Sequence, residues 1–308
     1  MRHCWQFRLR RYRQIKFRLI DVLSMVYFGL VGVLLIFFHQ QVVHPLRYIV
    51  SHGIIIFLIL EIVRWGEKSR PCSVPGILRM FYPIALVLYG WSEIGAISRM
   101  FWGDFWATEP IIRLDLLVFG NHPTIWFQQF YHPWLDELMH LFYDSYFLFM
   151  PMVSLTLFLR KKYQQNFAAL ALGTGVHLTN FLLFLIFPVL APFMTDTISS
   201  LSTRSYSGYL FYFITQITQA KGAQAGGTFP SVHVSAALAW ALAAWRYERK
   251  LGYILLPTSL GIGISAAYLG HHHAMDVIAG YLWAGLAFPM ILFLLNKRGE
   301  ELSAASKS

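Results

Sequence analysis

The chain has 308 residues, of which 56% are hydrophobic and only 13% are charged. Soluble globular domains usually carry about one-quarter charged residues, so this composition argues against that class. It also excludes intrinsic disorder, which requires few hydrophobic residues, and a disulfide scaffold, because the chain has only two cysteines. We therefore predict an integral membrane protein, and we attribute the net charge of +10 to membrane topology rather than to a nucleic-acid partner.

Long apolar runs indicate that the chain crosses the membrane as helices. A run of about twenty residues is long enough to span a hydrocarbon layer of about 30 Å, and too long for the alternating strands of an outer-membrane barrel. The predicted fold is an all-α polytopic bundle of about eight transmembrane helices. The expected helices cover residues 19–38, 46–64, 77–98, 136–159, 167–191, 231–246, 250–269 and 276–296.

The distribution of basic residues predicts the orientation of the bundle. With the N-terminus inside, 20 of the 25 lysines and arginines fall on the inner side, as the positive-inside rule requires. A cleaved signal peptide is not expected, because HQQVVHP follows the first apolar run where small residues should mark cleavage. The expected parts are a basic cytoplasmic tail over 1–18, N-terminal transmembrane helices over 19–98, an outer interfacial segment over 99–135, a catalytic transmembrane core over 136–296 and a second cytoplasmic tail over 297–308.

Two long connections, over about 99–135 and 192–230, lie on the outer side in this topology, whereas the inner loops are short. Functional residues concentrate in loops that a rigid scaffold positions, so we expect the site on the outer side, which is the periplasmic, extracellular or lumenal face. Tryptophans and prolines in the first connection indicate segments that lie along the lipid headgroups.

A glycine-rich segment at the end of the second outer connection has the residues of a phosphate cradle. It reads Gly226-Gly-Thr-Phe-Pro-Ser-Val-His233 and opens the sixth expected helix. Proline suits the first helical turn, glycines let backbone approach a ligand, and the N–H groups of a helix start attract anions. Gly226, Gly227 and Ser231 are therefore candidate phosphate-binding residues, and His233 is a candidate catalytic residue beside them.

A second segment, Gly270-His-His-His-Ala-Met-Asp276, forms the short outer turn before the last expected helix. If that helix begins near His272, then His272 and Asp276 stand four residues apart on one face, where the carboxylate can bond one ring nitrogen and leave the other as a nucleophile. The three consecutive histidines do not predict a metal site, because neighbours on a helix point about 100° apart. We expect neither a metal nor a cofactor.

These two motifs resemble those of the type-2 phosphatidic acid phosphatase superfamily, which comprises membrane lipid phosphatases and phosphotransferases. Pro230, Ser231 and His233 match the family's second motif, Pro-Ser-x-His. His272 and Asp276 match the His-x-x-x-Asp that ends its third motif. The resemblance implies that His272 attacks phosphorus, that Asp276 orients it and that His233 protonates the leaving group.

The chain departs from the family pattern in its cations. The first motif, a lysine followed seven residues later by Arg-Pro, is missing, and Ala266 stands where the third motif has an arginine. This form resembles the inositol phosphorylceramide synthase branch, whose members move a phosphorylated headgroup between lipids. A phosphodiester bears one negative charge and needs fewer cationic contacts than a monoester, so we expect a diester substrate. The side chains available to replace the missing cations are Arg204, Lys221, His271 and His273.

Several polar residues lie inside the apolar runs, where an interhelical hydrogen bond is the favoured role. They are His140, Tyr143 and Asp144, which share one helix face near its outer end, and His177 and Asn180 in the next helix. The alternative role for the first three is to line the same cleft as the two motifs. We expect Glu61 to pair with Arg64 one turn later and Glu93 to be protonated or hydrogen-bonded.

The predicted function is a membrane lipid phosphotransferase that works through a phosphohistidine intermediate. Its expected partners are a phospholipid donor and a lipid or water acceptor. If water is the acceptor, the same residues make a lipid phosphate phosphatase. The alternative from another class is a transporter or scaffold, but the sequence lacks the inverted repeats that transporters often show.

Overall fold

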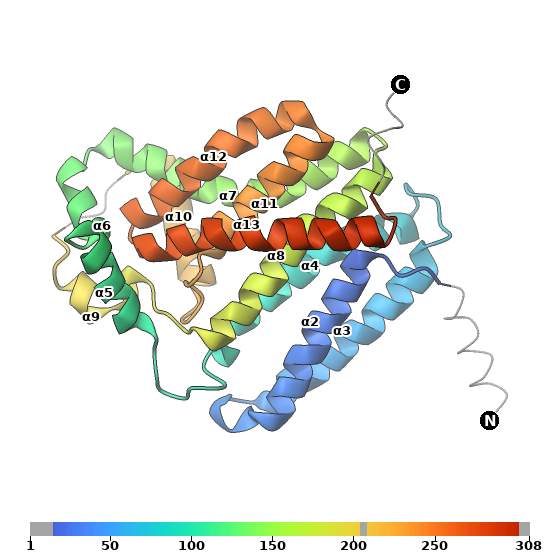
Figure 1. Cartoon of the computed structure of the whole chain (residues 1–308), viewed down its shortest axis with the longest axis horizontal. Coiled ribbons are helices and arrows are strands. Elements are labelled where there is room, and N and C mark those ends of the chain that lie inside the picture. The colour runs from blue at the N-terminus through green and yellow to red at the C-terminus, as the bar shows by residue number, and fades with distance from the viewer. Residues whose placement is uncertain (1–14, 204–207, 302–308) are drawn as a thin grey trace.

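The computed structural model describes residues 15–203 and 208–301, and over these ranges the chain folds into helices without a β-sheet (Figure 1). The long helices are α2 (Leu19–Phe37), α3 (Pro45–Gly66), α4 (Val74–Ile97), α7 (Pro133–Leu159), α8 (Tyr163–Ile186), α11 (Val232–Tyr247), α12 (Arg249–Tyr268) and α13 (Ala274–Lys297). The shorter elements are α5 (Thr108–Phe119), α6 (Pro123–Trp126), α9 (Asp196–Ser199), α10 (Leu210–Gly222) and the 3-10 turns η1 (His39–Gln41), η2 (Phe127–Phe130) and η3 (Pro192–Met194).

Each of the eight predicted apolar runs forms one long helix, which confirms the all-α membrane fold. Among the described residues, seven of these helices are long and apolar enough to span a membrane. The eighth, α11, has 16 residues and extends for about 24 Å, less than a full hydrocarbon layer. The run predicted over 167–191 ends early, at Ile186, because the residue before Pro188 is disfavoured in a helix.

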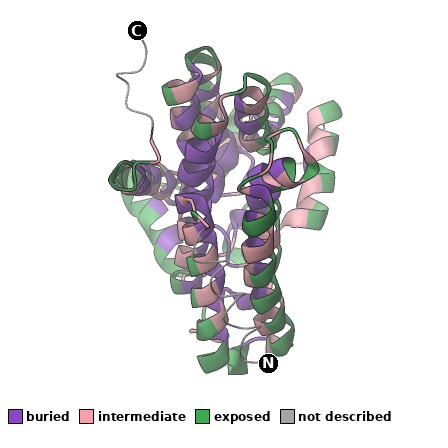
Figure 2. Cartoon of the chain, turned by 90° about the vertical axis from the view of Figure 1, so that its right-hand side faces the viewer, coloured by how far each residue is buried: buried purple, intermediate pink, exposed green. Residues whose placement is uncertain are grey.

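Helix α8 forms the centre of the bundle. It packs against α2, α4, α7, α11 and α13, and α12 covers α11 and α7. Figure 2 shows that buried positions line the facing sides of the helices, whereas exposed positions cover their outer sides. Many of the exposed side chains are large and apolar, such as Phe57 and Leu58 on α3, as expected where lipid replaces water.

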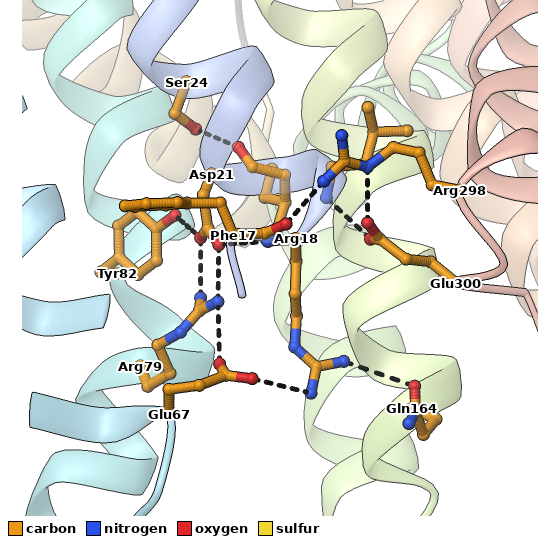
Figure 3. A network of polar contacts seen from close by, with 12 residues as sticks. Phe17, Arg18, Asp21, Ser24, Glu67, Arg79, Tyr82, Gln164, Arg298 and Glu300 are labelled. Atoms are coloured by element: carbon orange, nitrogen blue, oxygen red, sulfur yellow. Dashed lines mark hydrogen bonds and ion pairs between the residues drawn. The ribbon is translucent and has the colours of Figure 1, made fainter. Parts of the chain in front are cut away.

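A buried ion pair joins the first helix to the third at one end of the bundle (Figure 3). The Arg79 guanidinium donates two hydrogen bonds, of 2.7 and 2.6 Å, to the two carboxylate oxygens of Asp21. Arg79 is 2% exposed and Asp21 is fully buried. This bidentate geometry fixes the start of α2 against α4.

The two ends of the described chain meet beside this pair. Arg298 donates a 2.6 Å hydrogen bond to the carbonyl of Phe17, and the backbone N–H of Leu19 donates a 2.7 Å bond to Glu300. Both ends therefore lie at the same end of the bundle, as an even number of crossings requires.

Both intramembrane glutamates are hydrogen-bonded, and for Glu61 the partner is the one that the sequence suggested. Arg64 Nε donates a 2.8 Å hydrogen bond to Glu61, which confirms that pair. The buried Glu93 on α4 accepts a 2.8 Å bond from His52 Nε2 on α3 and a 3.4 Å bond from the Tyr27 hydroxyl on α2. Glu93 thus joins three helices through hydrogen bonds.

The second outer connection, which the sequence presented as a loop, contains the helix α10. Glu137 on α7 accepts hydrogen bonds from three backbone N–H groups at the start of α10, those of Tyr209, Phe211 and Tyr212. Thr215 of α10 donates a 2.8 Å bond to Asp144 and shares a 2.9 Å bond with His140 Nδ1. These contacts hold α10 against α7 at the same end of the bundle as α5 and α6.

Candidate active site

The two histidines of the two motifs lie beside each other although 38 residues separate them in the chain. Nε2 of His272 is 3.3 Å from Nδ1 of His233, and the ring centroids are 5.4 Å apart. Both side chains are buried: His272 is 2% exposed and His233 is 8% exposed.

Two oxygens face the other ring nitrogen of His272. Nδ1 donates a 3.2 Å hydrogen bond to the backbone carbonyl of Thr228, and the nearest carboxylate oxygen of Asp276 is 3.6 Å away. Because the Thr228 carbonyl can only accept, it holds the proton on Nδ1 and leaves Nε2 with its lone pair. The Asp276 oxygen accepts a 2.9 Å bond from the His273 N–H, and at 3.6 Å from Nδ1 it favours the same proton position through its charge rather than through a hydrogen bond. Nε2 is therefore the nitrogen suited to nucleophilic attack.

The helix boundaries differ slightly from those assumed in the sequence analysis. α13 begins at Ala274, so His272 lies in the turn before the helix rather than within it. α11 begins at Val232 and Ser231 is its N-cap, so Pro230 precedes the first helical turn. The pairing of His272 with Asp276 consequently depends on the shape of the turn and not on helical spacing alone.

Two contacts hold the two motif segments together, and a third holds one of them against α8. The backbone N–H of Ser231 donates a 2.9 Å hydrogen bond to the backbone carbonyl of Asp276. A side chain at Gly280 would meet the Ser231 carbonyl at 2.7 Å, so only glycine permits α11 and α13 to approach so closely. Asn180 on α8 donates a 2.9 Å bond to the carbonyl of Pro230, which holds the segment before α11 against α8.

Asp115 on α5 positions the turn from outside the bundle, and the sequence analysis did not single it out. Its carboxylate accepts hydrogen bonds from the backbone N–H groups of Ala274, at 3.2 Å, and Met275, at 2.9 Å. These N–H groups are at the start of α13, where a carboxylate is a favourable cap. Burial raises the pKa of Asp115, while the two donors lower it by a smaller amount.

A cavity of about 570 Å³ opens beside the histidine pair. Its lining includes His233 and His272 together with Val232 and Thr228, so the start of α11 faces into it. The first N–H groups of a helix have no acceptor within the helix, and they attract anions. This arrangement can bind a phosphate group against both imidazoles.

Aromatic rings hold the imidazole of His233 in place. Tyr143 stacks on it with centroids 4.7 Å apart and an interplanar angle of 23°, and Tyr146 lies 4.4 Å away. The Tyr146 hydroxyl is in turn 2.9 Å from His177 Nε2. Of the polar residues noted in α7, Tyr143 therefore lines the cavity, whereas His140 and Asp144 bond to α10.

The predicted substrate-binding residues divide into two groups. Gly227, Lys221 and His271 line the cavity, and His271 packs 4.5 Å from the ring of Tyr143. Three others lie outside it: Gly226 packs against Ser98, the Ser231 hydroxyl accepts a bond from Val234 N, and His273 Nε2 bonds the Leu190 carbonyl. Arg204 lies outside the described residues.

The cavity has few cationic side chains. Among the described residues that line it, Lys221 is the one lysine or arginine. Over the described ranges, no group of three or more His, Cys, Asp or Glu side chains is arranged to hold a metal ion.

The spacing of the two histidines has a consequence for substrate binding. An attacking nitrogen needs a distance of about 3–3.5 Å to phosphorus, and a general acid needs about 2.6–3.2 Å to the leaving oxygen. The 3.3 Å bond between the two rings leaves no room for a phosphorus atom. If His272 attacks phosphorus and His233 protonates the leaving group, as the resemblance implies, a substrate has to separate the two rings first.

Comparison with known proteins supports the reading of the two motifs. The model of the PAP2 superfamily matches residues 109–290, which covers more than half of the chain and includes both motif segments and α5. Comparisons with curated proteins and with solved structures give no match. The chain therefore belongs to the PAP2 superfamily, whose members are phosphatases or phosphotransferases that act on lipid phosphates.

Proposed function

We propose that the protein is a lipid phosphotransferase that moves a phosphate-linked headgroup from a phosphodiester donor to a lipid hydroxyl, as inositol phosphorylceramide synthases do. One observation carries this proposal: the cavity that joins the two imidazoles has a single lysine and no arginine among its described lining residues. A phosphomonoester with up to two charges requires more cationic contacts than a diester with one charge.

In the proposed first step, His272 Nε2 attacks phosphorus and forms a P–N bond. The bond between phosphorus and the donor's leaving oxygen breaks, and His233 gives that oxygen its proton. The carbonyl of Thr228 and the carboxylate of Asp276 stabilise the positive charge that develops on the His272 ring. The amides at the start of α11 stabilise the charge on the phosphoryl oxygens.

In the second step, the acceptor hydroxyl attacks phosphorus, its proton passes to His233, and the P–N bond breaks. The chain returns to its starting state without a metal or cofactor. His233 can carry this proton before the first step because the negative charge of the bound substrate favours the protonated imidazole.

We propose further that the cavity faces the outer side of the membrane and that both termini face the cytoplasm. The supporting observation is the excess of basic residues at the opposite end, where Arg79, Arg298 and the start of α2 lie together. The basic residues over 1–14 and 302–308 belong to this count but lie outside the described residues.

The test uses purified full-length protein with a phosphodiester donor such as phosphatidylinositol, a ceramide acceptor and, separately, phosphatidic acid. With a donor labelled at phosphorus, we expect the phosphate and its headgroup to move together to the ceramide, and a labelled histidine to appear on rapid quenching. Both signals should be lost in His272→Ala. His39→Ala is the matched control, because that histidine is exposed and does not line the cavity. Release of inorganic phosphate from phosphatidic acid without any transfer would instead identify a phosphatase, and normal turnover by His272→Ala would refute the mechanism.

A further inference from the structure

The catalytic cavity continues well below the two histidines. Trp240 lines it and lies seven residues after His233 on α11, which is about 10 Å further along the helix axis. Between these two levels the walls carry mostly hydrocarbon side chains, including those of Met150 and Phe181. A phosphate group bound at the histidines would therefore have an apolar space beneath it.

One wall of this lower space comes from α4. The side chains of Ile84, Val87, Leu88 and Trp91 all line the cavity. They recur at helical positions i, i+3, i+4 and i+7 and so form one continuous stripe on the helix. The family match begins at residue 109, so this wall belongs to the part of the chain that the family model does not cover.

The cavity opens on the side of the bundle between α4 and α7. At this opening Leu88 is 61% exposed and Phe147 is 48% exposed, and both line the cavity. α4 and α7 each pack against α8, and toward the inner end of the bundle they meet through the rings of Phe81 and Phe158. Because both helices span the membrane, exposed apolar side chains on their flanks face lipid.

The floor of the cavity has a fixed position. Trp240 is 1% exposed, and its indole ring lies on the backbone of Gly173 in α8. A Cβ at Gly173 would meet the ring at 2.2 Å, so the ring occupies the place of a side chain there. The depth available to a ligand is thus set by one rigid, well-packed side chain.

Hydrogen bonds attach the α4 wall to the segment that precedes the phosphate site. Trp91 Nε1 donates a 2.8 Å bond to the carbonyl of Gly222, and the Ser98 hydroxyl donates a 3.2 Å bond to the carbonyl of Ala225. The backbone N–H of Gly95 donates a 3.2 Å bond to the side chain of Gln224. These bonds therefore fix the position of the α4 wall relative to the phosphate site.

We propose that α4 is the chain-binding wall of this site. One hydrocarbon chain of the donor lipid enters between Leu88 and Phe147, lies along Val87 and Leu88, and ends on Trp240, which sets the preferred chain length. This inference rests on the proposed function, since it takes the donor's phosphate to lie at His272. It assigns one wall of the chain-binding site to residues outside the family match, which begins at residue 109, whereas Phe147 and Trp240 lie within that match.

The first test is a series of donors with one headgroup and acyl chains of increasing length, assayed with wild type, Leu88→Trp and Trp240→Leu. Leu88→Trp narrows the opening, so we expect kcat/KM to fall about tenfold for long chains and to change little for the shortest chain. Trp240→Leu deepens the cavity, so the optimum should move to longer chains. Leu78→Trp is the control, because Leu78 is exposed on the same helix but does not line the cavity.

A second measurement does not depend on turnover. A phospholipid with a photoreactive group at the end of one acyl chain is incorporated into nanodiscs with the His272→Ala protein and irradiated. We expect labelled peptides from residues 84–91 and from Trp240, reduced by excess unlabelled donor and by Leu88→Trp.

The outcomes separate the two proposals. Equal effects of Leu88→Trp and Leu78→Trp at every chain length, or labelling confined to the outer faces of the bundle, would overturn the chain-binding wall. If wild type turns over no phosphodiester donor but residues 84–91 are labelled competitively, the proposed reaction fails while the wall stands.

Discussion

Replacing Asp115 tests whether α5 positions the turn that carries His272. This carboxylate is 3% exposed and accepts hydrogen bonds from the N–H groups of Ala274 and Met275, which directly follow the histidine turn. Loss of a helix N-cap costs about 0.5–2 kcal/mol, and a hydrogen bond to a charged group contributes about 1.5–3 kcal/mol. The 2.9 Å bond is strong and the 3.2 Å bond is weaker, so Asp115→Ala should destabilise the fold by about 2–3 kcal/mol.

The same substitution should also reduce the activity of the protein that remains folded. Without its cap the start of α13 can shift, and a misplacement of about 1 Å in a catalytic group costs about a hundredfold in rate. We therefore expect kcat to fall by about 10- to 100-fold in protein that is still folded at the assay temperature. Asp115→Asn keeps one acceptor oxygen and should lose about half of the stabilisation.

The assay combines thermal unfolding in detergent with lipid turnover measured well below the unfolding midpoint. Glu109→Ala is the matched control, because Glu109 lies on the same helix in an exposed pair with Arg113 and such pairs contribute little. If Asp115→Ala unfolds and turns over like Glu109→Ala, the turn does not depend on α5 and the reasoning is wrong.

Three further substitutions have expected outcomes that thermal unfolding and turnover can check. Arg79→Leu leaves the buried Asp21 carboxylate without its cation and should destabilise the fold by about 3–5 kcal/mol. Ser231→Ala removes the N-cap of α11 and should cost about 1 kcal/mol, with a smaller loss of activity than His233→Ala. Gly173→Ala forces the indole of Trp240 to move and should cost about 1–3 kcal/mol, and unchanged lipid turnover would show that the cavity floor is not rigid.

The helices and the pairing of the motifs could be predicted because their signals are local. A run of about twenty apolar residues has one stable form in a membrane, which is a helix. Counting these helices then places the segments containing His233 and His272 at the same end of the bundle. In the structure Nε2 of His272 lies 3.3 Å from Nδ1 of His233, and the chain topology alone does not specify this closeness.

The sequence did not reveal residues whose role depends on a distant partner. Asp115 is one charged residue in a segment rich in aromatic residues, and its partners lie 159 and 160 positions away. A residue that caps the helix directly following it can be recognised by its spacing from that helix, but a capping residue on a distant helix has no such sequence pattern. The one signal in the sequence was the negative charge of Asp115 within a segment predicted to lie along the lipid headgroups.

Adjacent residues of one motif have different contacts in the structure, and sequence spacing could not predict this difference. His272 faces the cavity, whereas the adjacent His273 bonds the Leu190 carbonyl on the other side of the turn. Ser231 matches the family motif, yet its hydroxyl caps α11 instead of lining the cavity. Such divisions depend on the backbone path of a turn, and they become visible only when the surrounding helices are in place.

The environment of His272 leads to a prediction about pH. Burial lowers the pKa of this imidazole to about 4, although its bond to the Thr228 carbonyl raises it by a smaller amount. With a lowered pKa, the ring stays neutral and nucleophilic at every pH well above 4, so protonation of His272 should not reduce kcat/KM between about pH 5 and pH 7. An ordinary histidine would instead cause a tenfold loss for each pH unit below about 6.5.

The lowered pKa of His272 also makes the stability of the fold depend on pH. Between about pH 6.5 and pH 4 the unfolded chain binds a proton at His272 that the folded protein does not bind, so the free energy of unfolding should decrease as the pH falls through this range. His272→Gln, which cannot titrate, should show a weaker decrease in a pH series of thermal unfolding. An acid limb of kcat/KM near pH 6.5, together with an unchanged pH dependence of unfolding in His272→Gln, would mean that water reaches this ring and that the closed histidine pair is not the resting state of the enzyme.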